Sequence, residues 1–262
     1  MTSAILTDAH RQRAAHLKLH GLIAHWEELP ADQHPTIARL LEWEEHERGQ
    51  RGLDRRLRNA RLGDFKALAD FDWRWPKRID RKAITELMQG HFIKDASNIV
   101  LLGGNGVGKT TIAKNIAHQC VLAGHSALFT TAADLLNTLG AQDGTRALQR
   151  KLRHYANPEL LVIDEVGYLS YASHQADLLF EIISQRYESR STLITTNRPF
   201  AEWSDVFPNA ACVTSLIDRL VHHCDILAIE GESWRMKQSK ERAKRRTSAR
   251  AKAKPQSEGE NG

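Results

Sequence analysis

Short apolar runs recur at five places beyond residue 98, and polar or glycine residues bound each of them. Runs of this length, rich in Ile, Leu, Val and Thr, are typical of strands buried on both faces of a sheet. Helix-like segments separate them, and strands that alternate with helices form a parallel sheet through right-handed crossovers. We therefore predict an α/β domain with a five-stranded parallel sheet covered by helices, its strands over residues 99–102, 127–130, 160–163, 191–196 and 226–229.

The first 75 residues follow a different pattern. Their apolar residues recur at helical spacing with little that resembles a strand, which predicts a small all-helical domain. The segment 71–76, with Trp73, Trp75 and Pro76, is typical of a linker that docks this domain onto the core. We predict a helical domain at residues 1–75, a core domain at residues 76–235 and a basic disordered tail at residues 236–262.

Composition narrows the class of protein. The chain has 262 residues, of which 41% are hydrophobic and 26% charged, as is usual for a globular protein. No apolar run approaches the length of a membrane span, and the first residues lack a secretory apolar segment, so we expect a cytoplasmic protein without membrane contact. The scattered cysteines Cys120, Cys212 and Cys224 lack metal-ligand spacing and are expected to be reduced thiols.

Positive charge is concentrated at the end of the chain. Residues 236–262 contain nine Lys or Arg and three acids, so the net charge of this tail is +6. The net charge of the whole chain is +5, so the other residues together carry −1. A tail of this composition can follow a nucleic-acid backbone without reading sequence. The alternative is a solubilising tail without a ligand.

Residues 103–110 match the phosphate-binding pattern G-x-x-x-x-G-K-[ST] and directly follow a predicted strand. In this pattern the backbone N–H groups cradle phosphates, Lys109 reaches the β and γ phosphates, and the Thr110 hydroxyl suits Mg²⁺. The alternative is a glycine-rich turn between a strand and a helix. The predicted nucleotide-binding residues are Gly103, Gly104, Asn105, Gly106, Val107, Gly108, Lys109, Thr110 and Thr111.

Two acids end the predicted strand at residues 160–163. At the carboxyl edge of a parallel sheet, Asp164 can hold Mg²⁺ together with Thr110, and Glu165 can polarise an attacking water. The alternative is a buried strand that ends in two solvated acids. Together with the phosphate-binding loop, the acids predict hydrolysis of a nucleoside triphosphate.

Asn197 follows the predicted strand at residues 191–196 and should emerge at the same edge of the sheet. There its amide can hold the attacking water or contact the γ phosphate. The alternative is an Asn that begins a turn before Arg198 and Pro199.

These motifs, in this order, resemble the AAA+ ATPases, and within them the IstB-like transposition helper proteins and the related bacterial helicase loaders. The resemblance is carried by residues 103–110, 161–165, 195–197, 215–220 and 231–235. It implies that Arg219 is an arginine finger in the ATP site of a neighbouring subunit and that Arg235 is a second sensor. The alternative for Arg219 is a local ion pair with Asp218 or Glu230.

The resemblance also implies a function. We expect an ATPase that uses ATP and Mg²⁺, assembles into a homo-oligomer on double-stranded DNA, and presents this target to a partner transposase, with hydrolysis resetting the complex. In relatives, the helices after the second strand line a DNA channel. This makes the cations of residues 145–155 candidate phosphate contacts: Arg146, Arg150, Lys151 and Arg153. Separately, the helix predicted at residues 51–61 could lie along a duplex backbone through Arg55, Arg56 and Arg58. The alternative for either helix is an ordinary solvated face.

Two other functions stay open. A helicase loader would use the same ATPase but dock on a replicative helicase. A P-loop kinase for a small metabolite would need a substrate pocket and would leave Arg219 without a role, and the adjacent acids at positions 164 and 165 argue against it.

Overall fold

The computed structural model describes residues 6–168, 171, 173–207, 211–239 and 242–243. The chain forms two compact units, Met1–Arg58 and Asn59–Gly262, and each is described by itself. Residues 59–75 belong to the second unit, whereas the sequence groups them with the helical domain. The domain limits given above stay predictions, and most of the basic tail lies outside the described residues.

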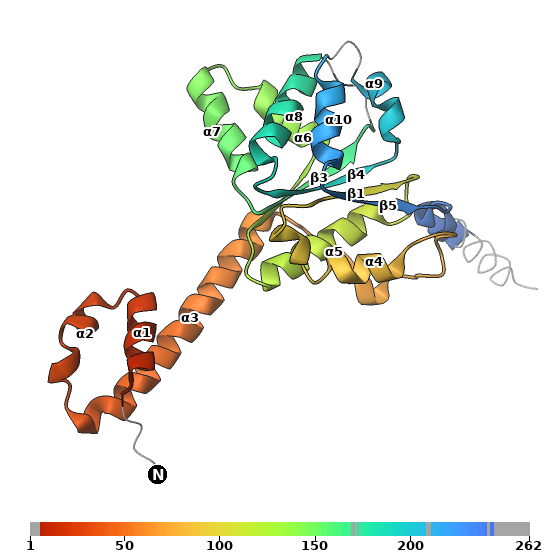
Figure 1. Cartoon of the computed structure of the whole chain (residues 1–262). Helices are drawn as coiled ribbons and strands as arrows, with labels where there is room; N and C mark the ends of the chain where they lie inside the picture. Colours follow the sequence, from red (N-terminus) through yellow and green to blue (C-terminus); the bar gives the residue numbers. More distant parts are fainter. Residues whose placement is uncertain (1–5, 169–170, 172, 208–210, 240–241, 244–262) are drawn as a thin grey trace, which may run out of the picture. The chain divides into compact units, whose positions relative to one another are not determined.

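The second unit is built on five parallel strands, as predicted (Figure 1). Their order across the sheet is β2-β3-β4-β1-β5. The strands are β1 (Asn98–Gly103), β2 (Ala127–Thr131), β3 (Leu160–Val166), β4 (Ser191–Thr196) and β5 (Cys224–Ile229). This order places the carboxyl ends of β3, β4 and β1 side by side, so the three segments with candidate chemistry meet at one edge.

Helices cover both faces of the sheet (Figure 1). One face carries α4 (Arg81–Leu87) and α5 (Lys109–Leu122). The other carries α6 (Ala132–Gly140), α7 (Thr145–Ala156), α8 (Ser173–Arg186), α9 (Trp203–Val206) and α10 (Val213–Val221). Short 3-10 helices are η3 (Leu68–Asp70), η4 (His91–Ile93) and η5 (Phe200–Glu202). The central strands are buried on both sides, which explains their nearly continuous apolar sequence.

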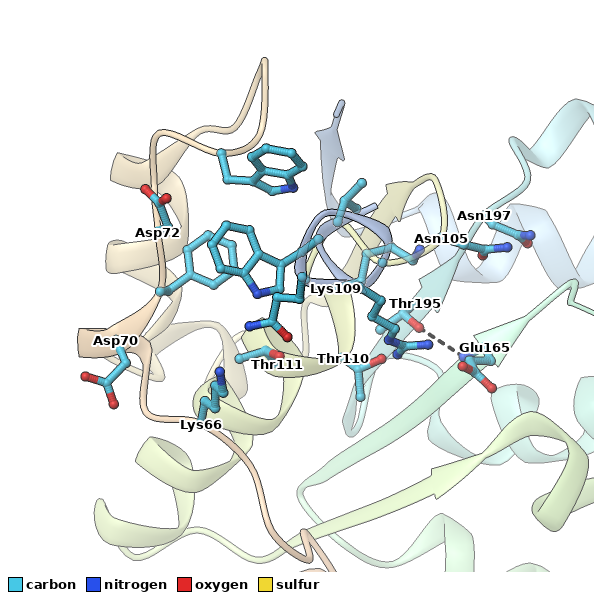
Figure 2. Close-up of a pocket in the computed structure, with 18 of the residues that line it drawn as sticks. Lys66, Asp70, Asp72, Asn105, Lys109, Thr110, Thr111, Glu165, Thr195 and Asn197 are labelled. Atoms are coloured by element: carbon cyan, nitrogen blue, oxygen red, sulfur yellow. Dashed lines mark hydrogen bonds between the residues drawn. The ribbon is translucent and has the colours of Figure 1, made fainter. Parts of the chain in front are cut away.

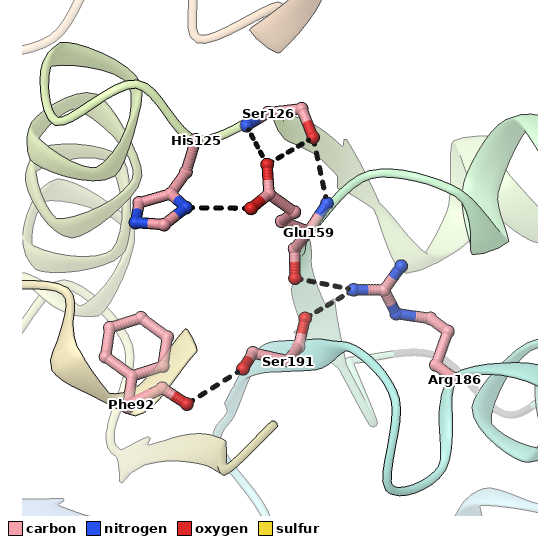
Figure 3. Close-up of polar contacts among 6 residues, drawn as sticks. All are labelled: Phe92, His125, Ser126, Glu159, Arg186 and Ser191. Atoms are coloured by element: carbon pink, nitrogen blue, oxygen red, sulfur yellow. Dashed lines mark hydrogen bonds and ion pairs between the residues drawn. The ribbon is translucent and has the colours of Figure 1, made fainter. Parts of the chain in front are cut away.

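Polar contacts hold the amino ends of the strands together (Figure 3). Glu159 accepts hydrogen bonds from the backbone N–H of Ser126 at 2.8 Å and from its hydroxyl at 3.0 Å, and its other oxygen lies 2.8 Å from Nδ1 of His125. Burial opposes ionisation, but these bonds hold the pKa of Glu159 below its ordinary value. The cluster therefore joins the start of β2 to the start of β3.

Arg186 lies beside this cluster and is 1% exposed. It donates to the carbonyl oxygens of Ala156 and Pro158, both at 2.8 Å, and to that of Ser191. Burial lowers the pKa of the guanidinium to about 9. Carbonyl oxygens compensate the buried charge here, so Arg186 ties the end of α7 to the start of β4. Figure 3 shows its contacts with Glu159 and Ser191.

The first unit contains α1 (Asp8–His16), α2 (His20–Ala24) and most of α3 (His34–Ala60), with the 3-10 helices η1 (Trp26–Glu28) and η2 (Ala31–Gln33). Its core is small and consists of Ala14, Leu17, Ile37 and Leu41 with partly buried neighbours. Arg13 donates two hydrogen bonds to Glu45, at 2.9 and 2.6 Å, which fixes α1 on α3. Every regular element in the described part of this unit is a helix, as predicted.

Among the described residues, no helix combines the length and the apolar character needed to cross a membrane.

Candidate nucleotide-binding site

The loop after β1 has the backbone conformation that phosphate binding requires. Gly106 and Gly108 have φ angles of +75° and +104°, in the left-handed region that favours glycine. A Cβ atom on Gly108 would lie 2.5 Å from the ring of Phe71, so this position has no room for a side chain either. Helix α5 begins at the next residue and directs its N-terminal end toward the loop.

Lys109 lies within this loop and is 9% exposed. Its Nζ donates to the carbonyl oxygens of Gly103 at 2.7 Å and Gly104 at 2.8 Å. Burial lowers the pKa of Lys109, while the charges of Asp164 and Glu165 oppose this shift. A buried ammonium group held by carbonyl oxygens fits a site for a strongly anionic ligand.

Thr110 and Asp164 form the candidate metal site. The Thr110 hydroxyl lies 2.9 Å from Oδ2 and 3.1 Å from Oδ1 of Asp164, whose side chain is buried. A hydroxyl and a carboxylate at the carboxyl edge of the sheet are the oxygen ligands that Mg²⁺ prefers. The structure thus brings together the two residues that the sequence assigns to the metal.

Glu165 and Asn197 lie at the cavity that these elements enclose (Figure 2). Glu165 is exposed, although its neighbours Asp164 and Val166 are buried. Within the described part of the chain, Oδ1 of Asn197 is buried without a hydrogen-bond partner. A buried amide oxygen without a partner is costly unless a rearrangement or a bound molecule satisfies it, and Asn197 itself lines the cavity.

The cavity has a volume of about 390 Å³. Seven consecutive loop residues, 105–111, line it, and Gly103 and Gly104 take part through their bonds to Lys109. Arg235 also lines the cavity. The structure therefore gathers seven of the nine predicted nucleotide-binding residues around one space, together with Glu165, Asn197 and Arg235.

An aromatic wall closes this cavity, and the sequence analysis missed it. Phe71, Trp75 and Trp234 line the space, and the rings of Trp75 and Trp234 meet edge to face at 5.4 Å between centroids. Trp75 Nε1 donates to the carbonyl oxygen of Glu232 at 2.9 Å. Trp75 was interpreted as part of a linker, and only its pairing with a segment near residue 234 shows that it belongs to the site.

Asn115 holds the segment at residues 66–68 in place beside the cavity. Its Oδ1 accepts from the backbone N–H of Leu68 at 2.9 Å, and its Nδ2 donates to the carbonyl oxygens of Lys66 at 2.9 Å and Thr111 at 2.8 Å. A side chain of α5 thereby holds the segment before Phe71 against the phosphate-binding loop. No pattern in the sequence indicates this role, since a lone Asn in a helix is ordinary.

Arg219 is not among the described residues that line the cavity. Its guanidinium lies 4.6 Å from the ring centroid of Phe180 and 5.9 Å from that of Tyr187, and it donates a hydrogen bond to Ser184. All three partners lie on or directly after α8. The local partners considered from the sequence, Asp218 and Glu230, are thus not the ones it contacts in this structure.

The chain matches the family described as IstB-like ATP binding protein over residues 12–242. This match covers most of the chain, including the loop, both acids and both arginines. The chain belongs to the IstB-like ATP binding proteins. The resemblance inferred from its motifs is confirmed.

Relatives in insertion sequences extend this result. The IstB-like chain is 35% identical to a protein of insertion sequence IS21 from Pseudomonas aeruginosa, over 88% of both chains. It is also 35% identical to a protein of insertion sequence IS5376 from Geobacillus stearothermophilus, over 78% of this chain and 81% of the relative. Both relatives carry the name of an ATP-binding protein.

A solved structure confirms the fold class. The crystal structure of DnaI is similar with a TM-score of 0.53 and 19% identity, over 66% of this chain and 90% of DnaI. The predicted AAA+ P-loop fold is therefore correct. Family and fold together make the IstB-like chain an ATPase, as the sequence predicts.

Proposed function

We propose that this chain is an ATP-dependent DNA-binding regulator of transposition. Its subunits assemble with ATP on double-stranded DNA and present this target to a partner transposase. The observation that carries the proposal is the similarity to proteins of insertion sequences over nearly nine tenths of the chain. A DNA target implies a cytoplasmic location, which stays a prediction.

The described residues have the chemistry to hold ATP. The loop N–H groups and the α5 N-terminus face the phosphates, and the Lys109 ammonium group, released from the carbonyl oxygens of Gly103 and Gly104, binds the terminal ones. Thr110 and Asp164 would hold Mg²⁺, which when bound neutralises charge on the phosphates. The aromatic wall of Phe71, Trp75 and Trp234 suits the base.

Hydrolysis requires a group that orients and polarises water. Glu165 reaches the cavity as an exposed carboxylate, and Asn197 also lines this cavity. We assign proton acceptance from water to Glu165 and water or phosphate contact to Asn197. Burial and the charge of Arg235 both lower the pKa of Lys109. Arg235 also lines the cavity, so we assign it contact with the phosphates as a second sensor.

Assembly is proposed because Arg219, the candidate finger arginine, is not among the described residues that line this cavity. Arg219 contacts α8 instead of the cavity of its own chain. A permanently charged planar guanidinium stabilises charge on a transferring phosphoryl group. Arg219 would therefore act on the ATP of a neighbouring subunit, and turnover would depend on the homo-oligomer.

Helix α7 supplies the candidate DNA contacts. Leu152, Tyr155 and Ala156 are buried on one side of this helix. The opposite side is exposed and lines a shallow groove with cations at helical spacing, Arg146, Arg150 and Arg153. A row of guanidiniums of this kind matches a phosphate backbone without reading bases.

The partner decides between transposition and helicase loading. DnaI shares the fold, but at 19% identity it supports no more than the fold. The relatives at 35% identity belong to insertion sequences, so we propose a transposase as the partner, with ATP hydrolysis resetting the complex.

The experiment measures complex formation on DNA by sedimentation. The protein is mixed with double-stranded DNA and ATP, and then either with the transposase encoded beside its gene or with a replicative helicase. A complex with the transposase that requires ATP and DNA is expected. A complex with the helicase alone would assign the chain to the loaders, and ATP-dependent phosphorylation of a small metabolite would assign it to the kinases.

Lys109→Ala tests whether complex formation depends on ATP binding by this chain. It removes the ammonium group from the loop and should weaken ATP binding at least about 100-fold, because charge-assisted contacts to phosphate are lost. Lys114→Ala on the same helix is matched in chemistry, and its Nζ lies over the ring of Phe129 outside the cavity lining. It should bind ATP and DNA like the unmodified protein.

A further inference from the structure

Strands β3 and β4 go out of register beside the cavity. Ile163 pairs with Ile194, but Val166 pairs with Thr196, so Asp164 and Glu165 together lie opposite the single residue Thr195. This is a β-bulge, an irregularity that redirects a side chain and is enriched next to active sites. The acid assigned to the metal, Asp164, and the acid assigned to water activation, Glu165, are therefore the two residues of the bulge.

The backbone of Glu165 is held in an unfavourable conformation. Its φ angle is +63°, a left-handed value that side chains with a Cβ rarely adopt. Such a conformation persists only where neighbouring contacts impose it. Its consequence here is that the Glu165 side chain is exposed toward the cavity while Asp164 and Val166 stay buried.

The hydroxyl of Thr195 makes the contacts that impose this conformation. Thr195 is fully buried, and its Oγ1 accepts a hydrogen bond from the backbone N–H of Glu165 at 2.9 Å (Figure 2). The same hydroxyl donates a hydrogen bond to Oδ1 of Asp164 at 2.5 Å. A bulge leaves a backbone N–H without its usual partner in the ladder. The Thr195 side chain thus pairs with the backbone N–H of the bulge residue Glu165 and also orients the carboxylate of Asp164.

We propose that Thr195 is a positioning residue for hydrolysis, whose hydroxyl holds the bulge in the form that aims Glu165 into the cavity. This inference rests on the proposed function, in which Glu165 polarises the attacking water. Thr195 acts through the backbone of Glu165, so its loss should lower turnover more than nucleotide affinity.

The test uses Thr195→Ala and Thr195→Ser in the full-length protein, because Ala and Ser differ here by the hydroxyl alone. We expect Thr195→Ala to lower kcat about tenfold or more with KM for ATP within about twofold, and Thr195→Ser to stay within about threefold of the unmodified protein. Thr130→Ala on β2 is the control, since its hydroxyl bonds to the carbonyl oxygen of Thr131 outside the cavity lining. An unchanged kcat for folded Thr195→Ala would overturn the proposal.

A double variant separates positioning from general stability. In the Glu165→Gln background, Thr195→Ala should cause little further loss, because the group that it positions is already impaired. Equal fold losses in both backgrounds would show that Thr195 acts independently of Glu165 and would overturn the proposal. If Thr195→Ala fails to fold, as judged by circular dichroism, Thr195→Val replaces it because Val keeps the branched shape.

The two proposals fail in different ways. Full hydrolysis by Glu165→Gln would contradict the role of Glu165 itself. A slow Glu165→Gln together with a fully active Thr195→Ala would contradict the positioning role alone.

Discussion

Arg219 donates a hydrogen bond to Ser184 of its own chain and stacks on Phe180, at a place that is separate from the described cavity lining. The guanidinium is thus held by half-buried side chains of α8 and not by the nucleotide pocket. Arg219 therefore lies outside the described lining of the ATP site of its own chain. This position supports the proposal that Arg219 acts on the ATP bound to a second subunit.

Replacing Glu165 with Gln should separate binding from turnover. The amide keeps the shape of the side chain but accepts a proton poorly, so ATP should bind with unchanged affinity while hydrolysis falls on the order of 100-fold. Phosphate release and equilibrium nucleotide binding are measured on the same preparation. Glu86→Gln on α4, an exposed acid near Lys82, is the control and should leave both quantities unchanged.

The exposed face of α7 should determine the salt dependence of DNA binding. Changing Arg146, Arg150 and Arg153 together to Gln should reduce the slope of log affinity against log salt by about 3, since each phosphate contact contributes about 0.9. Lys82→Gln on α4 is the control for a lost exposed cation. An unchanged slope for the triple variant would remove α7 from the DNA interface.

A test of the basic tail should not remove all of residues 236–262, although its positive charge extends over that whole segment. Nζ of Lys237 lies 4.1 Å from the ring centroid of Trp75 and 4.6 Å from that of Trp234, so Lys237 packs against the aromatic wall. Removing residues 240–262 instead leaves this wall intact. That truncation should flatten the salt slope without changing ATP affinity, and an identical slope would assign the tail no phosphate contact.

Glu159 should make stability depend on pH. Its pKa is lowered in the folded protein, so its contribution to stability is present above its unfolded pKa and is lost as pH falls through the lower folded value. Glu159→Gln should therefore reduce the free energy of unfolding at pH 7, with a difference that shrinks toward pH 3. Urea unfolding at both pH values measures this, and a constant difference would contradict the role of the carboxylate.

Local sequence signals predicted much of the fold. The loop at residues 103–110 and the apolar run before Asp164 are consecutive residues whose composition dictates their structure, and both lie where the sequence places them. Parallel order then brings Asn197 to the same edge. The sequence pattern is therefore enough to predict the structure of a continuous segment. It is also enough to predict that the carboxyl ends of parallel strands lie at one edge of the sheet.

Other features depend on pairings between distant segments. Trp75 and Trp234 meet only because the segments around residues 75 and 232 run together, as the hydrogen bond from Trp75 to Glu232 shows. The bulge opposite Thr195 is a one-residue difference in register between two strands that look regular in sequence. Neither relationship leaves a periodic trace in the chain.

The central claim is that one subunit completes the ATP site of the next. Its most direct test is the ATPase rate of mixtures of Arg219→Ala and Lys109→Ala proteins in the presence of DNA. Each variant alone should hydrolyse ATP poorly, but a mixed assembly can join an intact pocket from one chain to an intact Arg219 from another. We expect the mixture to exceed the weighted sum of the two variants, with a maximum at intermediate ratios. Rates that never exceed this sum, while co-assembly is confirmed by sedimentation, would contradict the account.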